Sequence, residues 1–238
     1  MHKRAIWIGY DPRPFEVEGF AVATHSIYRR LSEDIPINGV RLDQLRECGL
    51  YQRAVEKRDG KLFDPLSQAP MSTEFAISRF FVPHLTQDGW ALFADSDVMA
   101  RVDLVELFNE ADPSKACMVV KHDYTPANTV KMDGQVQTSY PRKNWSSVVL
   151  WNCAHKGTRA LTVEMINTVR GLWLHQFAWL DDNDIGALDP RWNFLVGEVP
   201  PDPTAKLVHF TNGTPNIEKY RDCEFADEWR AELALAVA

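Results

Sequence analysis

Short apolar segments of strand length alternate with segments of helical periodicity along this chain. Arg4–Ile8 and Gly39–Leu42 have the length and composition of strands, and the apolar residues between Phe15 and Leu31 recur at helical spacing. Further strand-length segments span 90–94, 116–120, 147–152 and 205–210, and segments that favour helices span 73–85, 157–172 and the residues from 226 onward. This alternation predicts an α/β fold with a mostly parallel central sheet flanked by helices.

Turn and cap residues predict where some of these elements begin. We expect one helix from Thr73 to about Leu85 with Ser72 as its N-cap, and a second helix over 157–172 that is capped by Thr158. Asp-Gly pairs are typical of tight turns, so they predict small hairpins within 58–70 and 131–136.

One strand-length segment, Trp90–Ala94, ends abruptly in two acids, Asp95 and Asp97, with Ser96 between them. In α/β proteins ligands bind at the carboxyl ends of central strands, and two carboxylates there can share one hard divalent cation. The same triplet is also ordinary turn and N-cap chemistry, and a chain with 33 acidic residues contains such triplets by chance. The triplet therefore indicates either a metal site for a nucleotide diphosphate or a plain turn.

A histidine, His209, ends the strand-length segment at 205–210 and precedes a loop that contains Asn212 and Gly213. A neutral imidazole can complete a metal site that two carboxylates begin, although a histidine at a strand end is more often structural. Backbone amides of the loop, loosened by its glycine, could hold phosphate oxygens. We predict a metal site made by Asp95, Asp97 and His209, with Ser96, Asn212 and Gly213 next to the bound nucleotide.

Two other segments carry candidate binding residues. The first strand ends in Gly9, Tyr10 and Asp11, and this combination suits a nucleotide pocket because glycine permits close backbone approach and tyrosine can stack on a base. Arg79 is the basic residue of the helix that leads into the strand before Asp95. It is predicted either to face the same crevice or to form an ordinary salt bridge.

Composition limits the class of protein. The 238 residues suffice for one large domain, and the net charge of −7 argues against non-specific nucleic-acid binding. Four widely separated cysteines without a CxxC pair make a structural zinc site or dense disulfides improbable. No signal segment and no run of ~20 apolar residues is found, so we expect a cytoplasmic protein without a transmembrane segment.

The ordered set of motifs resembles glycosyltransferase family 8, the glycogenin-like and bacterial sugar transferases of the GT-A fold. The resemblance covers nearly the whole chain. It rests, in chain order, on residues 8–11, Arg79 with 93–97, 146–152, 181–184, 188–193 and 207–210.

This resemblance implies one GT-A domain over 1–238, with a nucleotide-binding part at about 1–125 and an acceptor side and closing segment at about 126–238. It implies transfer of a sugar from a nucleotide diphosphate donor, usually a UDP-sugar, with retention, to a carbohydrate or lipid-linked glycan. Asp95, Asp97 and His209 match the family's ligands for Mn²⁺ (or Mg²⁺), 9–11 match its base- and ribose-binding segment, and Arg79 matches its donor-contacting arginine.

The resemblance also assigns a catalytic region, which holds the reactive face of the sugar. It comprises Asp181, Asp182, Asn183 and Asp184. The family places glycine three residues after its histidine and then a lysine for the diphosphate, whereas here Asn212 and Gly213 are third and fourth and the next lysine is Lys219. A degenerate GT-A protein that binds carbohydrate or a protein partner is therefore an alternative, and a phosphohydrolase with a nucleophilic aspartate is a weaker one.

Overall fold

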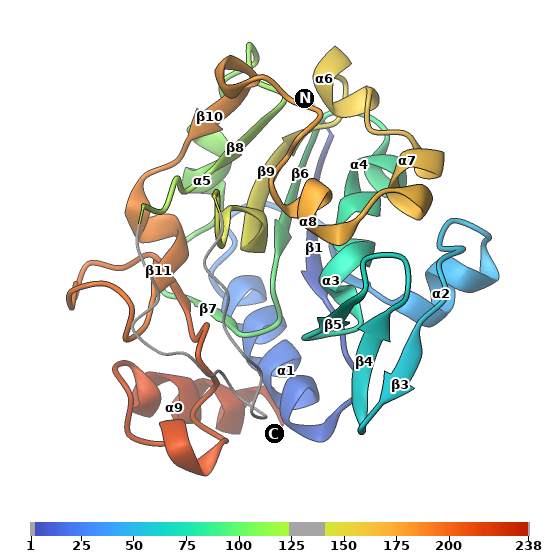
Figure 1. Ribbon diagram of the computed structural model, residues 1–238. Helices are drawn as coiled ribbons and strands as arrows, with labels where there is room; N and C mark the ends of the chain where they lie inside the picture. The colour runs from blue at the N-terminus through green and yellow to red at the C-terminus, as the bar shows by residue number, and fades with distance from the viewer. Residues whose placement is uncertain (1–2, 124–140, 238) are drawn as a thin grey trace.

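A six-stranded sheet forms the centre of the computed structural model, which describes residues 3–123 and 141–237 (Figure 1). In order across the sheet, its strands are β10 (Ile185–Ala187), β8 (Cys117–Val119), β9 (Val148–Asn152), β6 (Trp90–Ala94), β1 (Arg4–Gly9) and β2 (Ile37–Val40). β9 runs antiparallel to β6 and β8, and the other strands of this sheet share one direction. The predicted mostly parallel α/β sheet is therefore confirmed.

Helices cover both faces of this sheet. Their bounds are α1 (Pro14–Tyr28), α2 (Leu42–Glu47), α3 (Phe75–Ser78), α4 (Val82–Thr86), α5 (Val105–Asn109), α6 (Lys156–Arg159), α7 (Val163–Thr168), α8 (Gly171–His175) and α9 (Ala226–Ala236). Successive side chains of a strand point to opposite faces. In β6, Leu92 and Ala94 therefore pack in one apolar core with α1 and α5, while Ala91 and Phe93 pack in another with α2, α3 and α4.

A smaller sheet continues directly from the end of β6. It consists of β11 (Phe194–Leu195), β12 (Leu207–His209) and β7 (Val98–Ala100), with β12 antiparallel to β7. The register pairs His209 with Val98, one residue after Asp97. Sequence analysis did not predict β7, β10 or β11, which are two- or three-residue strands whose order depends on pairing with neighbours.

A third sheet confirms the turn predicted within 58–70. It contains β3 (Glu56–Arg58), β4 (Lys61–Asp64) and β5 (Ala69–Met71), paired antiparallel in that order. In Figure 1 this hairpin projects to the right of α1. The hairpin predicted within 131–136 lies outside the described residues.

The continuous helix predicted over 73–85 is wrong. The segment divides into α3, a 3-10 helix at Arg79–Phe81, and α4. Pro83 lies in the first turn of α4, where its missing N–H cannot continue the hydrogen-bond ladder of the preceding turn. Ser72 does not cap this segment: Asp11 Oδ2 accepts from the backbone N–H of Glu74 at 3.0 Å instead.

The helix predicted over 157–172 is also divided, into α6, α7 and α8. His155, not Thr158, caps α6, because its Nδ1 accepts from Gly157 N–H at 3.0 Å. The Thr158 hydroxyl is buried and donates to Ala116 O at 2.6 Å, which ties α6 to the start of β8. Thr162 begins a new helix by accepting from Met165 N–H at 3.1 Å.

Within residues 3–123 and 141–237, no helix combines the length and apolar character that are needed to cross a bilayer.

Candidate metal centre

Two carboxylates and an imidazole converge where β6, β7 and β12 meet. Asp95 and Asp97 lie between β6 and β7, and His209 is the last residue of β12. Candidate ligand atoms of the three residues all lie within 4.8 Å of one another, and His209 Nε2 is 3.2 Å from Asp97 Oδ1. Backbone pairing of β7 with β12 brings these residues together although they are distant in sequence.

The backbone on both sides of the acids is fixed. Asp95 N–H donates to Ser147 O at 2.9 Å, which ties the first acid to the entrance of β9. Phe210 N–H donates to Asp97 O at 2.9 Å, which extends the pairing between β7 and β12 by one bond. The two acids therefore lie in an anchored loop.

The residue types and spacing fit one divalent cation. Oxygen and nitrogen ligands bind such ions at roughly 2.0–2.3 Å, so two ligands of one ion lie about 3–4.6 Å apart. The side chains of Asp95 and Asp97 are 16% and 13% exposed and that of His209 is 2% exposed, so the cluster is reached from the side of the acids. A cation held there would keep positions for other ligands.

Arg79 contacts one of the acids directly. Its Nη1 lies 2.8 Å from Asp95 Oδ1 and 2.9 Å from Ser146 O, and its Nε donates to Phe75 O at 3.2 Å. The arginine is 7% exposed. Arg79 thus forms a salt bridge with one of the candidate ligands, where the guanidinium orients the Asp95 carboxylate. Contact with a donor stays a prediction.

Asn193 supports His209 and was given no role by sequence analysis. Its Oδ1 lies 2.8 Å from His209 Nδ1, and its Nδ2 donates to Ser147 Oγ at 2.9 Å. Asn193 is fully buried. The only signal in the sequence was its place in the matched segment 188–193, because a buried amide carries no periodicity of its own.

Glu16 was also missed. It lies in the first turn of α1, is 4% exposed, and accepts from Ser96 Oγ at 2.8 Å. Burial raises the pKa of Glu16 to about 8, with a further upward contribution from Asp97, while the Ser96 hydrogen bond and Arg13 lower it. Ser96 therefore faces the protein interior. The contact with a nucleotide that was predicted for Ser96 is untested.

Two half-buried histidines near the centre, His122 and His175, have lowered pKa values. Burial, together with the Arg79 charge, lowers the pKa of His175 to about 3, and His175 Nδ1 lies 2.7 Å from Ser146 Oγ. Burial, together with His209, lowers the pKa of His122 to about 3. Sequence analysis gave neither histidine a role.

The loop after β1 is close to the centre but largely occupied by its own contacts. Asp11 is 1% exposed, and its carboxylate accepts from Arg13 at 2.8 and 2.9 Å as well as from Glu74 N–H. The Arg41 guanidinium stacks over the Tyr10 ring at 3.5 Å. At Gly9 a Cβ would lie 2.5 Å from the Phe75 ring, so glycine is required there for packing.

The loop after His209 is closed by side-chain contacts. Asn212 Nδ2 donates to Glu198 Oε1 at 2.9 Å. Gly213 has φ 146°, and a Cβ there would lie 2.3 Å from the Tyr220 ring, so Tyr220 packs directly on this glycine. Asn212 and Gly213 are both buried. The Gly213 N–H donates to Phe210 O at 2.8 Å, so it is already hydrogen-bonded within the loop. The phosphate contacts predicted for Asn212 and Gly213 stay predictions.

The predicted catalytic region is not brought to the metal centre. Asp184 O accepts from Ala116 N–H at 2.8 Å, and the next residue, Cys117, is level with Ala91 across β9. Ala91 precedes Asp95 by four residues of extended chain, about 13 Å. In Figure 1, β10, which follows this segment, lies well above β7 in the view. The segment that lies away from the metal centre comprises Asp181, Asp182, Asn183 and Asp184. Their role in catalysis stays a prediction.

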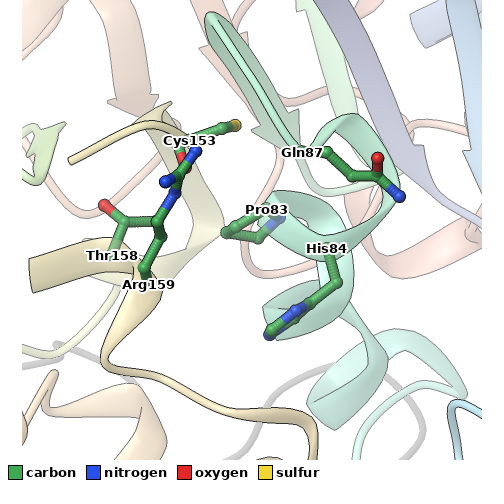
Figure 2. Close-up of a pocket in the computed structure, with 6 residues that line it drawn as sticks. All are labelled: Pro83, His84, Gln87, Cys153, Thr158 and Arg159. Atoms are coloured by element: carbon green, nitrogen blue, oxygen red, sulfur yellow. The ribbon is translucent and has the colours of Figure 1, made fainter. Parts of the chain in front are cut away.

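A cavity lies at the opposite end of the sheet from the metal centre. It has a volume of about 370 Å³ and is lined by Pro83, His84, Gln87, Cys153, Thr158 and Arg159 (Figure 2). Cys153 N–H donates to Gly89 O at 2.9 Å, just before β6 begins. This cavity therefore has no contact with the three candidate ligands.

No protein-family model matches the sequence. Solved structures with similar folds include three glycosyltransferases. The bifunctional glycosyltransferase WbbM is 16% identical with a TM-score of 0.62, covering 98% of this chain and 50% of WbbM. The glycosyltransferase GlyE of Streptococcus pneumoniae TIGR4 is 15% identical with a TM-score of 0.56, covering 98% of this chain and 60% of GlyE. The galactosyltransferase LgtC, solved with donor and acceptor sugar analogs, is 13% identical with a TM-score of 0.56, covering 97% of this chain and 95% of LgtC.

This chain thus spans half the length of WbbM and less than two thirds of GlyE. Protein CDI of Arabidopsis thaliana is 46% identical over 234 residues, which cover 96% of this chain and 85% of that protein. The chain has the GT-A glycosyltransferase fold and belongs to the same family as Protein CDI.

Proposed function

We propose that this protein is a metal-dependent glycosyltransferase that moves a sugar from a nucleotide diphosphate donor, a UDP-sugar, to a carbohydrate or lipid-linked glycan. The observation that carries the proposal is the convergence of Asp95, Asp97 and His209 at the carboxyl end of β6 within a GT-A fold. Ligands of open α/β sheets bind at this edge.

In the proposed reaction, Asp95, Asp97 and His209 would hold Mn²⁺ or Mg²⁺. A cation there would supply positive charge to offset the negative charge that develops on the leaving diphosphate. Arg79 fixes the orientation of Asp95 through the 2.8 Å ion pair. The anchored loop holds both carboxylates in place before the donor arrives, so little reorganisation is needed.

The finer features of the donor and the reaction come from the family 8 resemblance. It favours uridine as the base, retention at the anomeric carbon, and one domain divided at about residue 125 between donor and acceptor sides. LgtC, which shares this fold, was solved with donor and acceptor sugar analogs.

A screen of nucleotide sugars by thermal unfolding tests the proposal. A ligand at 100 times its Kd stabilises a folded protein by about 2.7 kcal/mol, which shifts Tm by several degrees. We expect one UDP-sugar to raise Tm with Mn²⁺ present and to have little effect with EDTA. A set of UDP-, GDP- and CMP-sugars that leaves Tm unchanged in both conditions contradicts the proposal.

Replacing one of the metal-binding residues should remove the Mn²⁺-dependent thermal stabilisation. Asp97→Asn keeps the size of the side chain but removes a negative charge from the cation site, so we expect the Mn²⁺-dependent rise in Tm and the transfer of sugar to be lost. Asp222→Asn is the control, because Asp222 is exposed and its carboxylate forms an ion pair with Arg221, away from the three candidate ligands. Full transfer by Asp97→Asn with the cation still bound would refute the assignment.

A second candidate function is a GT-A protein that binds carbohydrate or a protein partner without catalysis. The closed loop after His209 favours it, because Asn212 bonds Glu198 and no lysine follows until Lys219. Calorimetry with UDP separates the two candidates: Mn²⁺-dependent binding supports the transferase, and no binding in either condition supports the second candidate.

A further inference from the structure

The side-chain amide of Asn193 has a defined orientation in the structure. Its nitrogen lies 3.4 Å from Asn144 O and 2.9 Å from Ser147 Oγ, while its oxygen faces His209 Nδ1 at 2.8 Å. A backbone carbonyl can only accept a hydrogen bond, so the atom that faces Asn144 O must be the amide nitrogen. The oxygen is then the atom that faces His209.

This orientation fixes where the imidazole carries its proton. An amide oxygen has no hydrogen to give, so His209 Nδ1 must donate to it. In the neutral ring Nε2 then has its lone pair free, and this atom is the one that lies 3.2 Å from Asp97 Oδ1. Nε2 and the carboxylate oxygen present two electron pairs to the same space, which is the arrangement that a cation requires.

The same amide also connects the histidine to the other acid. Ser147 Oγ accepts from Asn193 Nδ2, and Ser147 O accepts from Asp95 N–H at 2.9 Å. Ser147 Oγ donates in turn to Asn144 O at 2.7 Å, so its hydrogen is already used and its lone pair is available to Asn193. A continuous hydrogen-bonded chain therefore runs from Asp95 through Ser147 and Asn193 to His209.

We propose that Asn193 is the positioning residue of the metal centre, which holds His209 in the tautomer with Nε2 unprotonated and directed at Asp95 and Asp97. The inference rests on the proposed metal dependence. Partners of this kind orient histidine ligands in metalloproteins, and their loss typically weakens metal binding 10- to 100-fold.

Mn²⁺ titration of three variants tests this role, with affinity read by calorimetry or by electron paramagnetic resonance of free Mn²⁺. Asn193→Leu has a similar volume but cannot accept from Nδ1, and we expect Mn²⁺ to bind about 10- to 100-fold more weakly. Asn193→Asp keeps an acceptor for Nδ1, so its affinity should be within a few-fold of wild type. Ser147→Ala removes the nearer of the two partners of Nδ2, together with the Ser147 bond to Asn144 O, but leaves the amide oxygen facing Nδ1. It should therefore change affinity less than Asn193→Leu.

The outcomes separate the inference from the proposed function. If wild type binds no Mn²⁺, the metal dependence fails. If wild type binds Mn²⁺ and folded Asn193→Leu binds it equally well, the metal dependence stands and the role of Asn193 is refuted. Circular dichroism and Tm of each variant show whether it is folded.

The ¹⁵N spectrum of His209 tests the tautomer without any metal, so it remains decisive if Asn193→Leu does not fold or if no cation binds. In wild type at pH 8 we expect a protonated Nδ1 and an unprotonated Nε2. A ring with its proton on Nε2 refutes the inference. Loss of the Nδ1–H preference in Asn193→Leu, and its retention in Asn193→Asp, would identify the amide oxygen as its cause.

Discussion

Glu16 lies beneath the loop that carries both candidate carboxylate ligands, in a setting where a negative charge is unfavourable. Burial, with Asp97 nearby, raises its pKa from the ordinary value of 4.5 to about 8. Ser96 supplies the hydrogen bond that partly offsets this effect. The folded protein therefore binds a proton at Glu16 more tightly than the unfolded chain does.

This difference predicts a pH dependence of stability. Between pH 4.5 and about 8 the folded state holds more protons at Glu16 than the unfolded state, so the free energy of unfolding should fall as pH rises through this range. Glu16→Gln cannot ionise, and Ser96 can still donate to its amide oxygen. We expect the free energy of unfolding of this variant to depend less on pH. Near pH 8 it should exceed the wild-type value by on the order of 1–3 kcal/mol.

Urea denaturation at several pH values in EDTA measures this effect. Glu47→Gln is the matched control, because Glu47 is exposed and should leave the slope unchanged. Parallel profiles for wild type and Glu16→Gln would show that Glu16 is ionised in the folded protein at neutral pH.

At the scale of elements, the C-terminal helix α9 is held on α1 by a buried acid. Glu232 is 2% exposed, and its carboxylate contacts His25 at 2.6 Å, Arg29 at 2.9 Å and Arg30 at 3.1 Å. Burial alone would raise the pKa of Glu232, but the hydrogen bonds and charges of these partners outweigh it and lower the pKa. The contact therefore joins the first and last helices through charge.

Neutralising this acid should loosen α9. Because the folded pKa of Glu232 is lowered, its stabilisation is full above the unfolded pKa and is lost as pH falls. We expect the free energy of unfolding of Glu232→Gln, measured by urea titration, to be about 1–3 kcal/mol below that of wild type at pH 7. In acid the two proteins should have the same free energy of unfolding. Asp227→Asn, on the exposed side of α9, should cost only tenths of a kcal/mol, and an equal loss in both variants would contradict a specific role for Glu232.

The elements also show how far sequence reasoning reaches. The strands β1, β6, β8, β9 and β12 were predicted because each is a compact apolar run. The helices at 73–85 and 157–172 were predicted too long, because tertiary contacts of Asp11 with Glu74 and of Thr158 with Ala116 decide their ends. Periodicity carries no information on such long-range hydrogen bonds.

For the whole molecule, sequence reasoning predicted the fold and the residue types of the metal centre, because strand ends in an α/β sheet share one edge. Asn193 and Glu16 could not be predicted, since a buried amide and a buried acid become recognisable only through the atoms that they contact. The segment 181–184 was placed by resemblance alone, whereas the pairing of β10 with β8 sets its position.

Thiol accessibility tests the packing of the whole molecule. Cys48 is exposed, and the other three cysteines are buried or half-buried, with burial raising the pKa of Cys153 to about 12 and of Cys223 to about 11. With Ellman's reagent at pH 8 we expect one fast thiol, which Cys48→Ser removes, and four thiols after unfolding in urea. Fast reaction of Cys117 or Cys153 in the native protein would show that the sheet is not packed as described.

The pairing of β7 with β12 has a mechanical consequence for the molecule. A cation between Asp97 and His209 would cross-link two positions that lie about a hundred residues apart, across the same junction where the backbones of both strands already meet. A cation that binds these positions only in the folded state stabilises that state by mass action. Removing the cation with a chelator would thus lower the free energy of unfolding even in the absence of any sugar, by the amount that cation binding contributes to the folded state.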